Sequence, residues 1–106
     1  MEQNQKRTRL TLQSKLEELL ESDHVYYQPP ENLKMEYPCI RYSKSGIEDI
    51  YANNIKYISR DIYDIVVISK KPDHPVIKKI LELPYSEFDR HYVFDNLNHD
   101  IIRLYY

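Results

Sequence analysis

The sequence predicts one α+β domain spanning residues 1–106, with a mainly antiparallel sheet of four to five strands and two helices packed on one face. Apolar residues recur at helical spacing in two stretches and alternate with polar residues in several others. Proline and polar clusters separate these stretches. A chain of 106 residues has the usual size of one domain and is too short for two ordinary cores.

The first predicted helix covers residues 8–22. One apolar stripe recurs through it at helical spacing: Leu12, Leu16, Leu19 and Leu20. A short extended segment, residues 25–27, follows it. Pro29 and Pro30 end this segment because each lacks a backbone donor and has a restricted φ angle. Residues 28–38 are therefore expected to form a loop.

Residues 39–43 alternate between apolar and polar types, which predicts a half-buried strand. The next segment, residues 44–56, contains the only glycine and shows no sustained period, so we expect a long exposed loop. Loops of this length are uncommon in compact domains and are often ordered by a partner. Ile47, Ile50 and Tyr51 are therefore candidate contact residues.

The strongest strand signal covers residues 57–69. The second half of this segment is apolar on both faces, as in a central strand covered on both sides or a strand whose outer face meets another subunit. Tyr63, Ile65 and Val67 are every second residue and therefore share one of these faces. We expect these three side chains to form a subunit contact.

A second helix is expected after Asp73, a capping residue, with Pro75 in its first turn and Pro84 beyond its end. Two strands, residues 86–94 and 101–106, then form an antiparallel hairpin around a polar turn at residues 95–100. Tyrosines of this hairpin complete the predicted contact residues: Tyr92, Tyr105 and Tyr106.

The sequence contains no recognisable catalytic motif. One glycine cannot build a phosphate-binding loop, and there is no nucleophile elbow. Asp61 and Asp64 lie three residues apart on a predicted strand, so they leave opposite faces. His91 and His99 could approach each other across the last hairpin, but their spacing matches no zinc motif. We expect no enzyme activity, no cofactor and no metal.

Composition narrows the possible partners. The formal net charge is −2 with acids and bases mixed, so sequence-specific DNA binding is not expected. No apolar run approaches the ~20 residues of a membrane-spanning helix, and the polar amino terminus lacks the apolar core of a secretory signal. A single cysteine, Cys39, suits a reducing compartment. Eleven tyrosines favour extensive protein contact, although they also pack well in a small β-rich core.

Four segments together resemble the tail terminator, or tail completion, proteins of long-tailed bacteriophages. They are the amino-terminal amphipathic helix, VYYQPPENLKMEYPCIRYSKSGIEDIYANN, YISRDIYDIVVISKKPDHPVIKKILEL and FDRHYVFDNLNHDIIRLYY. The resemblance covers nearly the whole chain and depends on the ensemble, since no segment is a catalytic motif.

The resemblance implies a structural virion protein, assembled in the host cytoplasm and located at the head-proximal end of the tail. Such a protein is a hexameric ring that caps the tail tube, ends its growth and offers a joining surface for head-completion or neck proteins. DNA passes through the ring without sequence-specific binding. The residues alone leave an alternative open: a small intracellular adaptor or regulatory module that binds one protein partner through a tyrosine-rich sheet.

Overall fold

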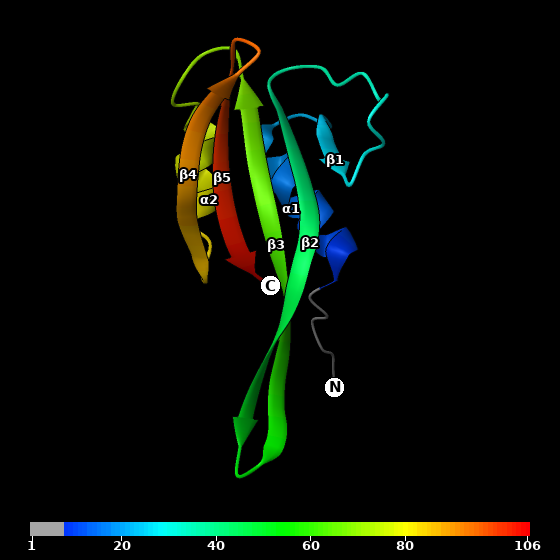
Figure 1. Ribbon diagram of the computed structural model, residues 1–106, viewed down its shortest axis with the longest axis vertical. Coiled ribbons are helices and arrows are strands. Elements are labelled where there is room, and N and C mark those ends of the chain that lie inside the picture. The colour runs from blue at the N-terminus through cyan, green and yellow to red at the C-terminus, as the bar shows by residue number, and fades with distance from the viewer. Residues whose placement is uncertain (1–7) are drawn as a thin grey trace.

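The computed structural model describes residues 8–106, apart from the side chain of Tyr57. It is an α+β fold in which two helices accompany a five-stranded, mainly antiparallel sheet (Figure 1), as predicted. The strand order is β1-β2-β3-β5-β4, with only the β1/β2 pair parallel. The elements are α1 (Arg9–Leu20), β1 (Val25–Tyr27), β2 (Cys39–Ala52), β3 (Ile55–Ser69), α2 (Pro75–Leu81), β4 (Ser86–Phe94) and β5 (Leu97–Tyr105). Residues 1–7, which include most of the predicted polar amino terminus, lie outside the described part.

Local capping interactions fix where the helices begin. Thr8 precedes α1, and its side chain accepts a hydrogen bond from the backbone N–H of Thr11 while the Thr11 hydroxyl oxygen accepts one from the Thr8 N–H. His74, rather than the predicted Asp73, caps α2: its Nδ1 atom accepts a hydrogen bond from the Val76 N–H. Pro75 is then the first residue of α2, as expected.

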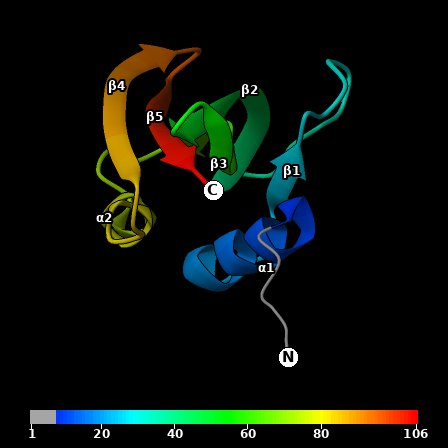
Figure 2. The same ribbon diagram turned by 90° about the horizontal axis from the view of Figure 1, so that it is seen from below.

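Both helices cover the same face of the sheet (Figure 2). The main core lies between them and the sheet, where Leu12, Leu16 and Ile80 meet Ile40 and Ile102. A second, smaller apolar cluster lies on the opposite face, which no described helix covers. It consists of Cys39, Val66, Ile68 and Ile101, with Tyr26, Met35 and Leu97 packed against it.

The helix-covered face of β3 is the one that we expected to be the outer face. Tyr63, Ile65 and Val67 are at most 2% exposed and belong to the main core. The prediction that they contact another subunit is therefore wrong for this fold. Alternation along a strand separates two faces, but it does not say which face the helices will cover.

Residues 44–56 are not a loop but the outer part of a long β-hairpin. β2 and β3 pair from Cys39–Ile68 to Ala52–Ile55, so both strands continue well beyond the rest of the sheet. Asn53 and Asn54 form the two-residue turn with φ angles of 54° and 64°, as a type I′ hairpin turn requires. Alternation was absent from the sequence because neither face of this segment is buried.

The last hairpin also turns more tightly than expected. Asp95 and Asn96 have φ angles of 57° and 62° and form a two-residue turn, so β5 begins at Leu97 rather than at residue 101. His99 and Asp100, which we had placed in a polar turn, are buried strand residues. Polar residue type favoured a loop here, but hydrogen-bonding partners within the sheet satisfy both side chains.

Replacing Leu16 with Ala should lower the free energy of unfolding by about 2–5 kcal/mol, because Leu16 is fully buried beneath the sheet. Denaturant unfolding followed by circular dichroism measures this difference. Leu10 lies on the same helix but is 66% exposed, so Leu10→Ala is the matched control and should change stability by less than about 0.5 kcal/mol. Equal effects of the two substitutions would contradict the packing of α1.

Candidate interaction surface

Residues 47–60, which we call the projecting hairpin, extend from the sheet as a two-stranded ribbon. The molecule consequently measures 50 Å along its longest axis and 28 Å across the other two. Among the described side chains of the hairpin, five large apolar ones are exposed: Ile47, Ile50, Tyr51, Ile55 and Ile58. Tyr51 and Ile55, which flank the turn, are 60% and 70% exposed. Exposed apolar residues grouped in this way are typical of a surface that contacts another macromolecule.

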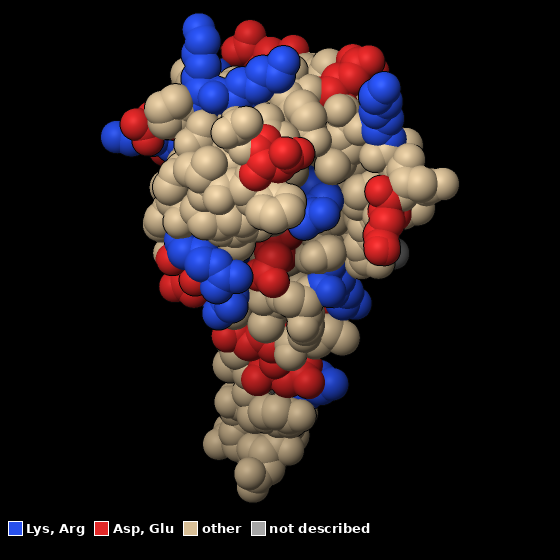
Figure 3. Space-filling model, turned by 45° about the horizontal axis from the view of Figure 1, so that its top comes forward, with Lys and Arg blue, Asp and Glu red and all other residues tan. Residues whose placement is uncertain are grey.

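The end of the hairpin carries no charge. Residues 50–55 contain no acidic or basic side chain, and the narrow end in Figure 3 is free of coloured charged groups. Closer to the sheet, three ion pairs join the two strands: Arg60 with Glu48, Lys56 with Asp49, and Lys44 with Asp61. Since opposite charges are paired across the ribbon, no strong field of one sign selects a nucleic acid.

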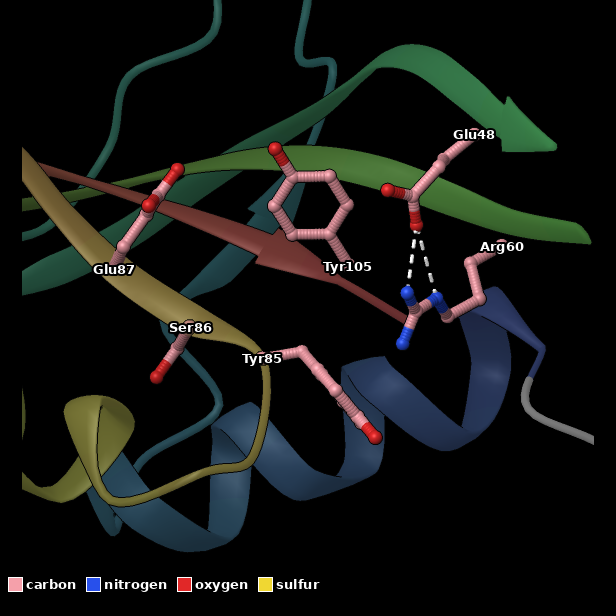
Figure 4. A pocket seen from close by; sticks show the side chains of 6 residues that line it. All are labelled: Glu48, Arg60, Tyr85, Ser86, Glu87 and Tyr105. Carbon is pink, nitrogen blue, oxygen red and sulfur yellow. Dashed lines mark hydrogen bonds and ion pairs between the residues drawn. The ribbon is translucent and has the colours of Figure 1, made fainter. Parts of the chain in front are cut away.

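Arg60 ties the root of the projecting hairpin to the sheet. Its Nε and Nη2 atoms donate hydrogen bonds of 3.1 and 2.7 Å to Glu48 Oε1 (Figure 4). Its guanidinium carbon also lies 4.3 Å from the centre of the Tyr85 ring, within cation–π range. Tyr85 and Tyr105 line the adjoining pocket of about 270 Å³, in which Glu48 already neutralises Arg60. This arrangement orients the hairpin and leaves little positive charge for an anionic ligand.

β4 forms the edge of the sheet opposite β1, and eight of its nine residues are exposed. Its carboxyl-terminal end is apolar: Val93 and Phe94 are 62% and 69% exposed. A free strand edge also presents unpaired backbone N–H and C=O groups, which another chain can bind by adding a strand. β4 is therefore a second candidate contact surface, separate from the projecting hairpin.

The histidines of the last hairpin have local hydrogen-bonding partners. His91 Nδ1 lies 2.9 Å from Asp100 Oδ1, and His99 Nδ1 lies 3.0 Å from the Leu97 carbonyl oxygen. The His99 ring stacks on Tyr92, with 4.7 Å between ring centres. These contacts join β4 to β5. Within residues 8–106, no group of three or more His, Cys, Asp and Glu side chains could hold a metal ion.

Burial makes the Cys39 thiol and two core tyrosines harder to ionise. It raises the pKa of Cys39 to about 11, so the thiol is a poor nucleophile near neutral pH. Burial, together with the nearby Asp61 carboxylate, raises the pKa of Tyr63 to about 12. The pKa of Tyr42 is also raised by burial, and its hydroxyl donates a 2.6 Å hydrogen bond to Gln13 Oε1. These groups stabilise the core.

The structure distributes the predicted contact residues over several places. Ile47, Ile50 and Tyr51 lie on the projecting hairpin and Tyr92 lies on β4, all of them exposed. Tyr105 lines the pocket at the hairpin root, and the Tyr106 hydroxyl lies 2.8 Å from the Thr11 hydroxyl, so both are only partly exposed. Five large, exposed apolar residues among the described side chains of the same two surfaces were missed: Ile55, Ile58, Phe88, Val93 and Phe94. The Asn53-Asn54 pair between apolar residues was the available sign of a hairpin turn, which would have placed Ile55 and Ile58 on a strand.

No protein-family model matches the chain, and no curated protein is detectably similar to it. Over residues 8–106, neither helix has the length and apolar character needed to cross a membrane.

Tyr63 should make the protein less stable in alkali. Its pKa is about 12 in the folded state and about 10 in an unfolded chain, so the folded form retains the proton between these values. The retained proton stabilises the folded state by at most about 2–3 kcal/mol. This stabilisation is fully present below pH 10 and is lost as the pH rises to about 12. Urea unfolding from pH 9 to 12 measures this loss.

The matched variants for this measurement are Tyr63→Phe and Tyr85→Phe. Tyr63→Phe removes the buried ionisable hydroxyl and should flatten the decline, whereas Tyr85 is 60% exposed and its replacement should leave the decline unchanged. An identical alkaline decline in the parent and in Tyr63→Phe would show that Tyr63 is not its source.

Proposed function

We propose that this protein is a structural subunit of a bacteriophage particle that caps the head-proximal end of the tail tube as a ring. In this role it ends tube growth and offers a joining surface to head-completion or neck proteins. The proposed neighbours are further copies of the chain, the tail tube protein and a neck protein, with DNA passing through the ring. The sites of action are the host cytoplasm during assembly and then the virion.

The projecting hairpin is the observation that best supports an assembly role. This chain of 106 residues has an exposed apolar ribbon and an open strand edge, and soluble monomers rarely leave such features uncovered. Two separate contact surfaces suit a subunit of a ring, because a head-to-tail contact uses different patches on each copy. The resemblance of the sequence to tail terminator proteins is the reason that we propose the phage tail as the assembly.

The chemistry of the described residues also favours a structural role over catalysis. The ionisable groups with clearly raised pKa values are buried core residues or, for Arg103, a side chain made more basic by its contacts with Tyr105 and Asp64. The histidines make contacts that hold strands and caps together. An adaptor that binds a single protein partner would use the same exposed hairpin, so an experiment on assembled particles must separate the two functions.

Removing the protein from an infection should leave DNA-filled heads but produce tails that are overlong or unattached, because nothing caps the growing tube. Electron microscopy of the lysate measures tail length and attachment, and supplying the intact chain from a plasmid should restore both. Tails of uniform length joined to heads in the absence of the protein would exclude the terminator function and favour the adaptor.

Complementation with variants links this function to the projecting hairpin. Tyr51→Asp places a charge at the exposed apolar end of the hairpin and should abolish restoration of normal tails while leaving the melting temperature within a few degrees of the parent. Leu33→Asp makes the same kind of change at an exposed apolar residue of the 28–38 loop and is the matched control. Restoration by Tyr51→Asp at the level of the control would contradict a role for the hairpin end.

A further inference from the structure

The projecting hairpin leaves the domain at an irregular point of β2. The pairing of β3 with β5 ends at Ile62, and opposite this residue the register of β2 shifts between Lys44 and Gly46. Ser45 is the extra residue, and its hydroxyl donates a 3.3 Å hydrogen bond to the Ile62 carbonyl. A bulge of this kind interrupts the ladder locally and bends the strand that contains it. Strand pairing is therefore interrupted where the sheet narrows to two strands.

Gly46, which follows the extra residue, adds backbone freedom at the same point. It is the only glycine of the chain, and its φ angle is not in the left-handed region. A Cβ atom at this position would lie 3.7 Å from Ile62 Cδ1, an ordinary contact distance. Neither conformation nor space therefore requires glycine here, and its remaining effect is the greater conformational freedom of its backbone. The bulge and Gly46 together are suited to act as a pivot.

Backbone contact between the domain and β3 ends at Asp61 on this side. The Tyr106 N–H donates a 2.8 Å hydrogen bond to the Asp61 carbonyl, and Lys44 Nζ lies 3.3 Å from Asp61 Oδ1. Beyond Asp61, β3 pairs with β2 alone. Among the described side chains of residues 47–60, Arg60 alone has a hydrogen bond, ion pair or ring contact with a residue outside β2 and β3. By such contacts, one side chain links the ribbon to the rest of the domain.

Tyr85 holds Arg60 from the domain side (Figure 4). The guanidinium carbon of Arg60 lies 4.3 Å from the centre of the Tyr85 ring and 6.0 Å from that of Tyr105. The Tyr85 carbonyl accepts a 3.0 Å hydrogen bond from the Tyr105 N–H, which fixes this residue to the end of β5. Its φ angle of 63° is in the left-handed region, which a bulky residue rarely adopts. A fixed and strained backbone thus presents the ring to Arg60.

We propose that the projecting hairpin pivots as an intact ribbon at Ser45 and Gly46, and that the contact between Arg60 and Tyr85 is the latch that holds it in the observed direction. The hydrogen bonds from Arg60 to Glu48 stay within the hairpin, so they move with it and keep the guanidinium in place for the ring. This inference concerns the chain by itself and is independent of the proposed function.

The latch is weak enough to open. Tyr85 is 60% exposed, and a cation–π contact at an exposed site contributes only modestly. Its loss should therefore raise the population of other hairpin directions by about two- to fivefold. A partner that binds the exposed end of the hairpin can redirect the ribbon in this way while the buried core of the domain stays intact.

Distances between two spin labels test the latch, with one label on the hairpin end and one on the sheet. Tyr51→Cys and Val93→Cys provide these sites, since both residues are exposed and lie on different parts of the molecule. Native Cys39 is fully buried with a thiol pKa of about 11, so it should not be labelled. Pulsed electron paramagnetic resonance then measures the distribution of distances in the parent and in the latch variants.

Tyr85→Ala should raise the population outside the main distance of the parent by about two- to fivefold, whereas Tyr85→Phe keeps the ring and should match the parent. Lys56→Gln is the matched control, because it breaks the Lys56–Asp49 ion pair inside the hairpin and leaves the latch in place. It should also match the parent. A parent-like distribution in Tyr85→Ala, or equal broadening in Tyr85→Phe or Lys56→Gln, would overturn the latch.

Two further measurements test the pivot. Gly46→Ala in the Tyr85→Ala chain restricts the backbone at the pivot and should reverse at least about half of the added population. No reversal would place the bend elsewhere and overturn the pivot. Labels at Ile47→Cys and Ile55→Cys, both exposed and both within the hairpin, should keep one distance in every variant. Broadening between them in Tyr85→Ala would show that the ribbon frays, which would overturn the proposal that it pivots intact.

Discussion

The unequal pairing of strand β3 is the constraint on which the rest of the molecule depends. From Ile62 to Ile68 this strand has partner strands on both sides, and its residues 63, 65 and 67 lie beneath the helices. From Ile55 to Asp61 it pairs along its length with β2 alone, apart from one bond from Tyr106 to Asp61. β5 ends at Tyr105 and β4 begins at Ser86, so the sheet narrows abruptly to two strands. One half of the β2/β3 strand pair therefore belongs to the domain, and the other half forms the projecting hairpin.

This division gives the two parts different sources of stability. The domain buries apolar side chains between the sheet and the helices and, in a smaller cluster, on the opposite face. The raised pKa of Tyr63 reflects burial in the first place and that of Cys39 reflects burial in the second. The hairpin has no core of its own, and an isolated two-stranded hairpin is marginally stable in water. It relies on the turn at Asn53 and Asn54, on cross-strand ion pairs and on Arg60, which lies between Glu48 and the Tyr85 ring. A ribbon held mainly at its root is well suited to adapt to a partner surface.

The same geometry explains why apolar residues remain exposed. Ile55 begins β3 and Phe94 ends β4, and both side chains lie outside the core between the helices and the sheet. A bulge between Phe88 and Arg90 interrupts the register of β4, and the strand ends in exposed Val93 and Phe94. Exposed apolar residues at the end of an open strand edge are typical of a surface that contacts another chain.

Local signals in the sequence determined most of the fold: the apolar stripe of α1, the proline that begins α2, and the alternation in residues 39–43 and 57–69 all correspond to observed elements. The sequence alone did not locate the hairpin, since residues 44–56 lack a buried face and the Asn53-Asn54 turn was the one available sign. It placed Ile47, Ile50, Tyr51 and Tyr92 on exposed surfaces but assigned Tyr63, Ile65 and Val67 to the wrong face. Periodicity reports that a strand has two faces, whereas the packing of helices that are distant in sequence decides which face becomes core and which edges stay open.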